Sequence, residues 1–227
     1  MSITVSVDLR PQFGPVRDQG DRPTCLAFAA SDAHAGLRDP WEPLSCEYLF
    51  YHAQNRASRD PTQGAFLSDT LVALREDGQP REAGWPYLAM LPTDLSTYYP
   101  PAAVDPLFGR DGIQVKNTFD AICRQLDSGN AVLVLSVLTG AFFRPPADGI
   151  IHAIAGDAIF PVPRHALVAV GYGHIGQTRL ILVRNSWGPT WGLAGYAWLT
   201  EPFVSQHAYD LALLTDEIDV SHRSAAV

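Results

Sequence analysis

The sequence predicts an α+β fold in which a helical N-terminal part precedes a β-rich C-terminal part. Three observations lead to this prediction. Helical periodicity dominates the first half of the chain, short apolar runs bounded by Gly, Pro or Asn dominate the second, and a proline-rich stretch over residues 86–106 separates them. Helices followed by strands are typical of α+β proteins, and a cleft between two such units is a natural place for a site.

Three helices are predicted in the first half, over residues 25–37, over residues 45–56 and after Phe66. Ser45 is a favoured N-cap residue, and Gly78 is a favoured residue for ending the third helix. Apolar side chains recur on one face of the first helix at spacings of four, three and four residues, at Leu26, Ala30, Ala33 and Leu37.

The stretch of residues 86–106 has neither a helical nor a strand period, and we expect a long connector there. Such connectors are uncommon in compact domains unless they serve a function or cross between lobes. A fourth helix then carries Cys123 and ends at Gly129. The predicted strands that follow are residues 131–137, 165–172, 179–184, 195–199 and 209–214.

Composition indicates a folded chain and excludes several classes of partner. Of the 227 residues, 47% are hydrophobic and 18% are charged, which is typical of a globular protein with a sizeable core. The net charge of −8 argues against nucleic acid and against an anionic membrane as partners, because both select basic patches. The apolar run of residues 131–143 is shorter than the roughly 20 residues of a membrane-spanning helix. It predicts a buried strand followed by a turn.

The three cysteines are too few and too scattered for a disulfide framework, so we expect a reducing compartment. Packing explains Cys123, on an apolar helix face, and Cys46, at the start of the second helix. Cys25 begins the first helix, directly after a turn-rich segment. A helix N-terminus favours the thiolate over the thiol, so Cys25 is a candidate nucleophile. On this local pattern alone, an ordinary buried cysteine is an equally good interpretation.

Two residues far downstream have the chemistry that a thiolate nucleophile needs. His165 lies at the entrance to a predicted strand, and Asn185 ends the next one. A cysteine nucleophile requires an imidazole within hydrogen-bond reach, and the imidazole requires a third group that fixes its tautomer. Each residue alone is explained by an ordinary structural role, so the prediction of a site rests on their combination with Cys25.

The segments around these residues resemble the papain family of cysteine peptidases, over most of the chain from about residue 6 to about residue 215. The matching segments are residues 19–29, 165–173 and 185–192 and the Gly195–Tyr196 pair, with weaker similarity at residues 7–10, 44–45 and 85–87. The resemblance implies a single papain-like catalytic domain over residues 1–227. Its helical lobe (about 19–88) would pack against a β-barrel-like lobe (about 110–215), with the active-site cleft between them.

The resemblance also implies an activity and the residues that perform it. The chain is expected to be a cysteine endopeptidase that hydrolyses peptide bonds through a thioester acyl-enzyme, with neither metal nor cofactor. Cys25 would be the nucleophile, His165 its base and Asn185 the residue that orients the imidazole. Gln19 would stabilise the oxyanion together with the backbone N–H of Cys25. Trp187 would shield the contact between His165 and Asn185 from water.

Substrate contacts are implied at fewer positions. Gly64 stands where family members pair with extended substrate backbone, and Leu135 and Ala166 would line a pocket for an apolar side chain of the substrate. Trp187 is expected to contribute to the substrate site as well. Ordinary core packing explains Leu135 about equally well. Peptides or proteins are therefore the expected substrates.

Three positions depart from the family pattern. Arg22 replaces a cysteine that members outside the cell usually bond to another cysteine near Gly64. Pro23 replaces a glycine that lets substrate backbone approach closely. Arg164 replaces a commonly acidic neighbour of His165 and is expected to lower the pKa of that histidine.

Two alternative functions stay open at this stage. The same catalytic residues can pass the acyl group to an amine, which would make the protein an acyl transferase or ligase. A cleft blocked at Pro23 would instead make it a non-catalytic binding module.

The start of the sequence and its cysteines raise two further expectations. Family enzymes usually carry an inhibitory pro-segment, whereas here the mature-like sequence begins within ten residues of Met1. Either the sequence is trimmed or activity is restrained in another way, for example by a separate inhibitor or activator protein. A prokaryotic-type member without disulfides or pro-segment is expected to act in the cytoplasm, or in another cell's cytosol as a delivered effector.

Overall fold

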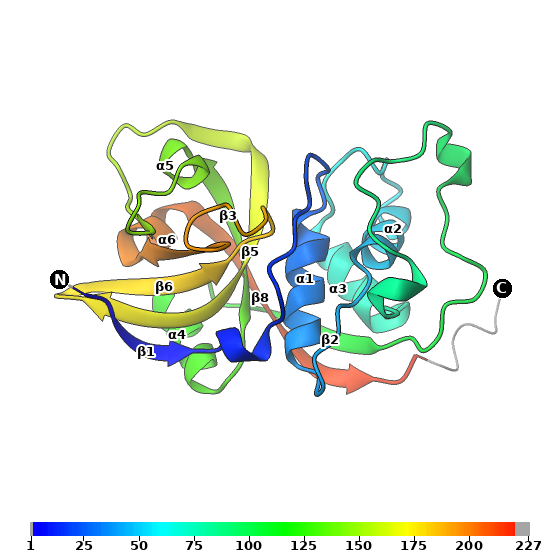
Figure 1. Ribbon diagram of the computed structural model, residues 1–227, viewed down its shortest axis with the longest axis horizontal. Coiled ribbons are helices and arrows are strands. Elements are labelled where there is room, and N and C mark those ends of the chain that lie inside the picture. The colour runs from blue at the N-terminus through cyan, green and yellow to red at the C-terminus, as the bar shows by residue number, and fades with distance from the viewer. Residues whose placement is uncertain (1, 221–227) are drawn as a thin grey trace. The chain divides into compact units, whose positions relative to one another are not determined.

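The computed structural model describes residues 2–220, and its three longest helices precede most of its strands along the chain (Figure 1). The predicted α+β class is confirmed. The chain forms two compact units. Within the described residues, one unit, here called the β unit, contains residues 2–18 and Gln114–Leu213; the other, the helical unit, contains Gln19–Ile113 and residues 214–220. The N-terminal segment therefore belongs with the strands that follow it much later in the sequence.

The helical unit is built from α1 (Cys25–Gly36), α2 (Cys46–Arg56) and α3 (Leu67–Glu76), which pack on one another (Figure 1). All three agree with the sequence prediction. The hydroxyl oxygen of Ser45 caps α2 by accepting a hydrogen bond of 3.0 Å from the backbone N–H of Tyr48. Gly78 follows α3 with a φ of +68°, a conformation that costs glycine least.

Helix α1 differs from its prediction in what it buries. The sequence predicted one apolar face that ends at Leu37, but the helix ends at Gly36 and Leu37 is 37% exposed. All residues from Leu26 to Ala35 are buried, including Ser31, Asp32 and His34. The helix is rich in alanine, and small side chains allow neighbouring elements to approach it closely on several sides. A helix buried on every side is a central element of its unit.

The proline-rich connector over residues 86–106 contains a single short 3-10 helix, η3 (Leu95–Thr97), within its described structure. The connector packs against the rest of the helical unit. Tyr98 forms a buried aromatic cluster with Trp85 and with Tyr48 of α2. A 3-10 turn, η2 (Glu82–Gly84), leads into it. The expectation of a long irregular connector is therefore confirmed, and its aromatic residues attach it to α2.

The β unit is a mixed sheet in the order β8-β3-β5-β6-β7-β4, with β1 paired to β5 (Figure 1). Its neighbours are antiparallel except β4 and β7, which are parallel. The strands are β1 (Thr4–Asp8), β3 (Val132–Thr139), β4 (Ile150–Ile151), β5 (Ile159–Ile175), β6 (Thr178–Arg184), β7 (Tyr196–Thr200) and β8 (Ala208–Ile218). β2 (Gly109–Val115) pairs with β8. The helices of this part are α4 (Phe119–Asp127), α5 (Gly140–Phe143) and α6 (Glu201–His207).

Every predicted strand is present, but β5 is longer than predicted. It begins at Ile159, so His165 lies within the strand and the prediction of a strand entrance is wrong. The first residues of β5 include Pro161 and Pro163, which removed the strand signal from that stretch because proline cannot donate to a sheet ladder. The turn predicted after β3 is the short helix α5. Within residues 2–220, no helix is both long and apolar enough to cross a membrane.

Candidate active site

His165 and Asn185 lie side by side in the β unit. His165 belongs to β5, and Asn185 directly follows the neighbouring strand β6. The Nε2 atom of His165 is 2.6 Å from Oδ1 of Asn185, and the backbone N–H of Ser186 donates to the same oxygen at 2.8 Å. A backbone N–H can only donate, so the Asn185 atom that it meets is the acceptor oxygen. His165 therefore carries its hydrogen on Nε2, and Nδ1 keeps the lone pair that a base needs.

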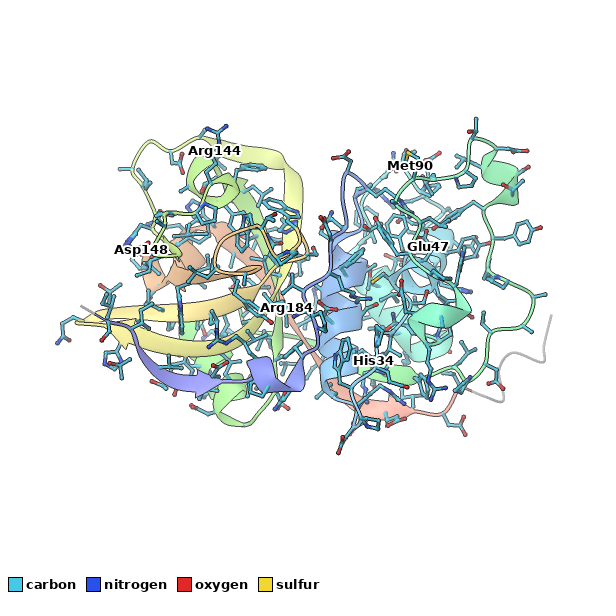
Figure 2. The ribbon with its side chains drawn as sticks, in the orientation of Figure 1. His34, Glu47, Met90, Arg144, Asp148 and Arg184 are labelled. Atoms are coloured by element: carbon cyan, nitrogen blue, oxygen red, sulfur yellow. The ribbon has the colours of Figure 1, made fainter. Side chains whose placement is uncertain are left out.

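A buried arginine anchors the strand end that carries Asn185. Arg184 is 1% exposed and donates hydrogen bonds to the carbonyl oxygens of Gly14 at 2.9 Å and Pro15 at 2.5 Å, and to the hydroxyl of Tyr196 at 2.8 Å (Figure 2). These bonds attach the N-terminal segment to the end of β6. Because Asn185 is the next residue, the same bonds restrict the backbone from which its side chain projects.

Aromatic rings cover the imidazole. The ring centre of Trp187 is 4.6 Å from that of His165, and Phe142 is 5.8 Å from His165 and 5.4 Å from Trp187. Phe143 stacks on Trp187 at 5.5 Å with an angle of 18° between the planes. The indole N–H of Trp191 donates to the carbonyl of Phe142 at 3.1 Å, which fixes this layer. The sequence predicted Trp187 as a cover but missed both phenylalanines, which end an apolar run that was interpreted as a buried strand followed by a turn.

A hollow of about 480 Å³ lies next to these rings, entirely within the β unit. Trp187 and Trp191 form one side of it, and residues 143–147 form another. Thr190 and Gly192 complete the lining. The hollow is therefore next to the ring that covers His165.

Burial lowers the pKa of His165 to about 4, and its hydrogen bond with Asn185 partly opposes this shift. The direction agrees with the sequence prediction, but the predicted cause is wrong. The guanidinium of Arg164 lies over the ring of Tyr209, 4.7 Å from its centre, and does not contribute to the shift. Neighbours on a strand point to opposite faces of the sheet, so adjacency in the sequence does not bring Arg164 close to the imidazole.

Cys25 is the first residue of α1 in the helical unit and is half-buried. The side chain of the N-cap residue Thr24 does not cap the helix; its hydroxyl is 3.0 Å from that of Tyr87. Gln19 is 6% exposed, and its side-chain amide donates to the carbonyl of Arg22 at 2.8 Å. The hydroxyl of Tyr87 donates to the carbonyl of Gln19 at 2.6 Å. These hydrogen bonds thus fix residues 19–25 within their own unit. None of the chain's three cysteines is disulfide-bonded.

The structure places the predicted substrate-binding residues in two settings. Gly64 is exposed in the helical unit, and a methyl group at this position would lie 3.8 Å from the carbonyl oxygen of Pro23. Leu135 and Ala166 face each other across β3 and β5 and are 7% and 2% exposed. Gly64 therefore borders the segment before Cys25, whereas Leu135 and Ala166 are core residues of the β unit. Their roles toward a substrate stay predictions.

Each unit brings together its own members of the predicted site. The helical unit holds Cys25 and Gln19 on one short segment, and in the β unit both Asn185 and Trp187 contact His165. Among the residues that the structure describes, no group of three or more His, Cys, Asp or Glu side chains could hold a metal ion. The chemistry of this arrangement is that of an oriented imidazole base and a cysteine at a helix N-terminus.

Sequence comparisons match the chain to papain-type proteases. The family model described as papain family cysteine protease matches residues 110–207. Probable cysteine protease RD21C of Arabidopsis thaliana is 26% identical over 86% of this chain and 43% of its own length. Papaya proteinase 4 of Carica papaya is 26% identical over 86% of this chain and 55% of its own length. The chain thus spans about half the length of the curated relatives it matches.

Solved structures of cysteine proteases share the fold. Xylellain, a cysteine protease from Xylella fastidiosa, has a TM-score of 0.75 at 22% identity and covers 94% of this chain and 87% of its own. The Carica candamarcensis cysteine protease CMS1MS2, solved in complex with E-64, has a TM-score of 0.71 at 23% identity and covers 94% and 99%. The chain therefore has the papain fold, and its residues 110–207 match the model of the papain family of cysteine proteases.

Proposed function

We propose that this protein is a cysteine endopeptidase with Cys25 as nucleophile and His165 as base. The observation that carries the proposal is the contact between His165 and Asn185, because it leaves Nδ1 of the imidazole as the atom that can take a proton from a thiol. The position of Cys25 at the N-terminus of α1 supports it, since this end of a helix stabilises a thiolate.

The proposed reaction has two steps. The thiolate of Cys25 attacks the carbonyl carbon of the scissile peptide, the C–N bond breaks, and His165 gives its proton to the leaving amine. A water molecule, deprotonated by His165, then attacks the thioester, and the C–S bond breaks to return the thiolate and release the acid. The side-chain amide of Gln19 and the backbone N–H of Cys25 would stabilise the oxyanion formed in each step.

Peptides or proteins are the proposed substrates. The relatives are named as proteases, and the hollow beside Trp187 lies next to the ring that covers the imidazole. We assign this hollow to the part of the substrate that leaves as the amine, because the imidazole must protonate that side. Substitution of Thr190 by Trp should narrow the hollow and raise KM for peptides extended on the leaving side. An equal effect on peptides that end in a small fluorogenic leaving group would count against this assignment.

Intact-mass labelling with an epoxysuccinyl peptide tests the proposed function directly. Wild-type protein, Cys25→Ala, His165→Ala and the control Cys123→Ser are incubated with the reagent under reducing conditions. We expect a single rapid addition to wild type and Cys123→Ser, none to Cys25→Ala and a strongly slowed addition to His165→Ala. Labelling of wild type no faster than that of Cys25→Ala would contradict the proposal.

We also propose a reducing compartment, such as a cytosol, for the folded protein. The support is that none of the three cysteines is disulfide-bonded in the structure. Protein taken from its natural source, denatured without reductant and titrated for thiols should show three. A titre of one would mean that two cysteines are bonded and would refute this assignment.

A further inference from the structure

A buried ion pair ties the segment before Cys25 to α2. Two guanidinium nitrogens of Arg22 donate to the two carboxylate oxygens of Glu47, at 2.6 and 2.9 Å. The side chains are 6% and 0% exposed, and Glu47 lies in the first turn of α2 inside the helical unit (Figure 2). A bidentate pair of this kind is short, strong and fixed in direction. Removal of one partner would leave a buried charge uncompensated.

The connector completes this pair. The carbonyl of Leu88 accepts from Arg22 at 2.6 Å, while the N–H of Leu88 donates to Glu47 at 2.9 Å. The hydroxyl of Tyr98 donates to the same carboxylate at 2.6 Å. The guanidinium also lies 5.2 Å from the centre of the Tyr87 ring. Glu47 therefore holds two separate segments, the one before Cys25 and the connector, against the start of α2.

Arg22 links this buried pair to Gln19 through its own backbone. The carbonyl oxygen of Arg22 accepts the hydrogen bond from the Gln19 side-chain amide at 2.8 Å. The direction of that amide thus depends on where the backbone of Arg22 lies, and the backbone is anchored through the Arg22 side chain to Glu47. Oxyanion stabilisation depends on donors placed within tenths of an ångström, so a shift of this backbone would act on the proposed reaction.

We propose that the Arg22–Glu47 pair is a positioning device that holds the Gln19 side-chain amide in its reactive arrangement. This inference rests on the proposed function of Gln19 and Cys25. Neither Arg22 nor Glu47 touches the reacting atoms; both act through the backbone of residues 19–25. Acylation, which develops an oxyanion, should therefore depend on the pair, whereas simple alkylation of the Cys25 thiolate should not.

The test compares Glu47→Gln, Arg22→Lys and the milder Tyr98→Phe with wild type. Arg81→Lys is the matched control, because its 2.6 Å pair with Glu42 is 48% and 41% exposed. For each protein, kcat and KM for a fluorogenic peptide are measured beside the rate of alkylation by iodoacetamide, which forms no oxyanion.

We expect kcat to fall about tenfold to a hundredfold in Glu47→Gln and Arg22→Lys, and by less in Tyr98→Phe. KM should stay within about twofold and the alkylation rate within about threefold, because small shifts of Gln19 cost mainly transition-state stabilisation. Arg81→Lys should match wild type. In a Gln19→Ala background, Glu47→Gln should change kcat less than about twofold, because the donor that it positions is already gone.

Three outcomes would overturn the inference. They are an unchanged kcat in the variants, a parallel loss of kcat and alkylation rate, and full additivity with Gln19→Ala. If Glu47→Gln does not fold, Arg22→Lys and Tyr98→Phe decide by the same criteria. A wild-type protein that hydrolyses no peptide would instead refute the proposed function, and this inference with it. If wild type is active and the variants have the same kcat, the inference is refuted but the proposed function is not.

Discussion

At the scale of single residues, the amide of Asn185 decides what His165 can do. Its oxygen accepts from both Nε2 of His165 and the N–H of Ser186, so the neutral imidazole has one tautomer. An amide orients the ring without adding charge. The pKa of His165 is therefore governed by burial, which lowers it to about 4.

Substitution of Asn185 by Asp should raise the pKa of His165. A carboxylate at the same position accepts the same hydrogen bond and adds a negative charge, which favours the imidazolium. An NMR pH titration in a Cys25→Ser background measures this pKa without the thiol. Asn117→Asp, at an exposed position, is the control and should leave the titration of His165 unchanged. An unchanged pKa in Asn185→Asp would mean that the contact is not formed in solution.

Substitution of Trp187 should lower kcat more than substitution of Phe143, although both residues belong to the aromatic layer. Trp187 lies directly on the imidazole at 4.6 Å, whereas Phe143 stacks on Trp187 and is 42% exposed. Trp187→Ala should admit water to the His165–Asn185 contact, raise the pKa of His165 towards its ordinary value and lower kcat about tenfold or more. Phe143→Ala should change kcat less. Equal effects of the two variants would contradict this order.

His34 makes stability depend on pH, independently of the site. It is fully buried in α1, its Nδ1 is 3.0 Å from Oε1 of Gln79, and burial lowers its pKa to about 3. The amide nitrogen of Gln79 donates to Ser31 at 2.5 Å and to the carbonyl of Ser45 at 2.9 Å, so His34 must donate through Nδ1. The folded protein thus keeps His34 neutral where an unfolded chain would protonate it.

The free energy of unfolding should therefore fall as the pH drops from about 6.5 towards 3, because the unfolded chain binds a proton at His34 that the folded protein does not bind. Urea unfolding at pH 7.0 and pH 4.5 measures the loss. His34→Gln removes the titrating group and should lose less stability between these pH values, whereas the exposed control His174→Gln should behave as wild type. An equal loss in His34→Gln and wild type would show that His34 does not contribute.

At the scale of elements, hydrophobic periodicity predicted the helices and strands that bury one face. The elements without such a pattern depend on tertiary contacts. α2, α3 and α4 carry recognisable caps and stripes, and all were predicted. β1 and β2 were missed, because exposed side chains interrupt their apolar pattern. α6 was missed because a helix of seven residues, with Pro202 in its first turn, gives no clear helical period in the sequence.

Ser45 should be a stronger cap than Thr118, because its hydroxyl has two roles. It accepts from the N–H of Tyr48 at 3.0 Å and donates to the carbonyl of Trp85 at 2.6 Å, whereas the Thr118 hydroxyl only accepts from the N–H of Ala121. Ser45→Ala should lower the free energy of unfolding by about 2–3 kcal/mol and Thr118→Ala by about 1 kcal/mol, measured by urea unfolding. A smaller loss in Ser45→Ala than in Thr118→Ala would contradict this account of α2.

At the scale of the whole molecule, local sequence supplied the candidate nucleophile but not its surroundings. Cys25 at a helix start and Asn185 at a strand end follow from local patterns, while their roles came from resemblance to a family. The pairing of Arg22 with Glu47 could not be predicted, since it joins different elements and has no periodic signal. The same holds for Phe142, which lies beside His165, and for Phe143, which stacks on Trp187, because their positions depend on how α5 packs against β3.

The central claim is that Cys25 and His165 act as one chemical unit. The most direct measurement is the pH dependence of iodoacetamide alkylation at Cys25 in wild type and in His165→Ala, followed by intact mass. Wild type should react rapidly already at about pH 6, where an ordinary thiol is almost wholly protonated, because the thiolate of Cys25 would stabilise the imidazolium and raise the pKa of His165 above the value that burial alone gives. His165→Ala should react only as the pH approaches about 8.5. Identical pH profiles in the two proteins would contradict the claim, because the imidazole would then not contribute to formation of the thiolate.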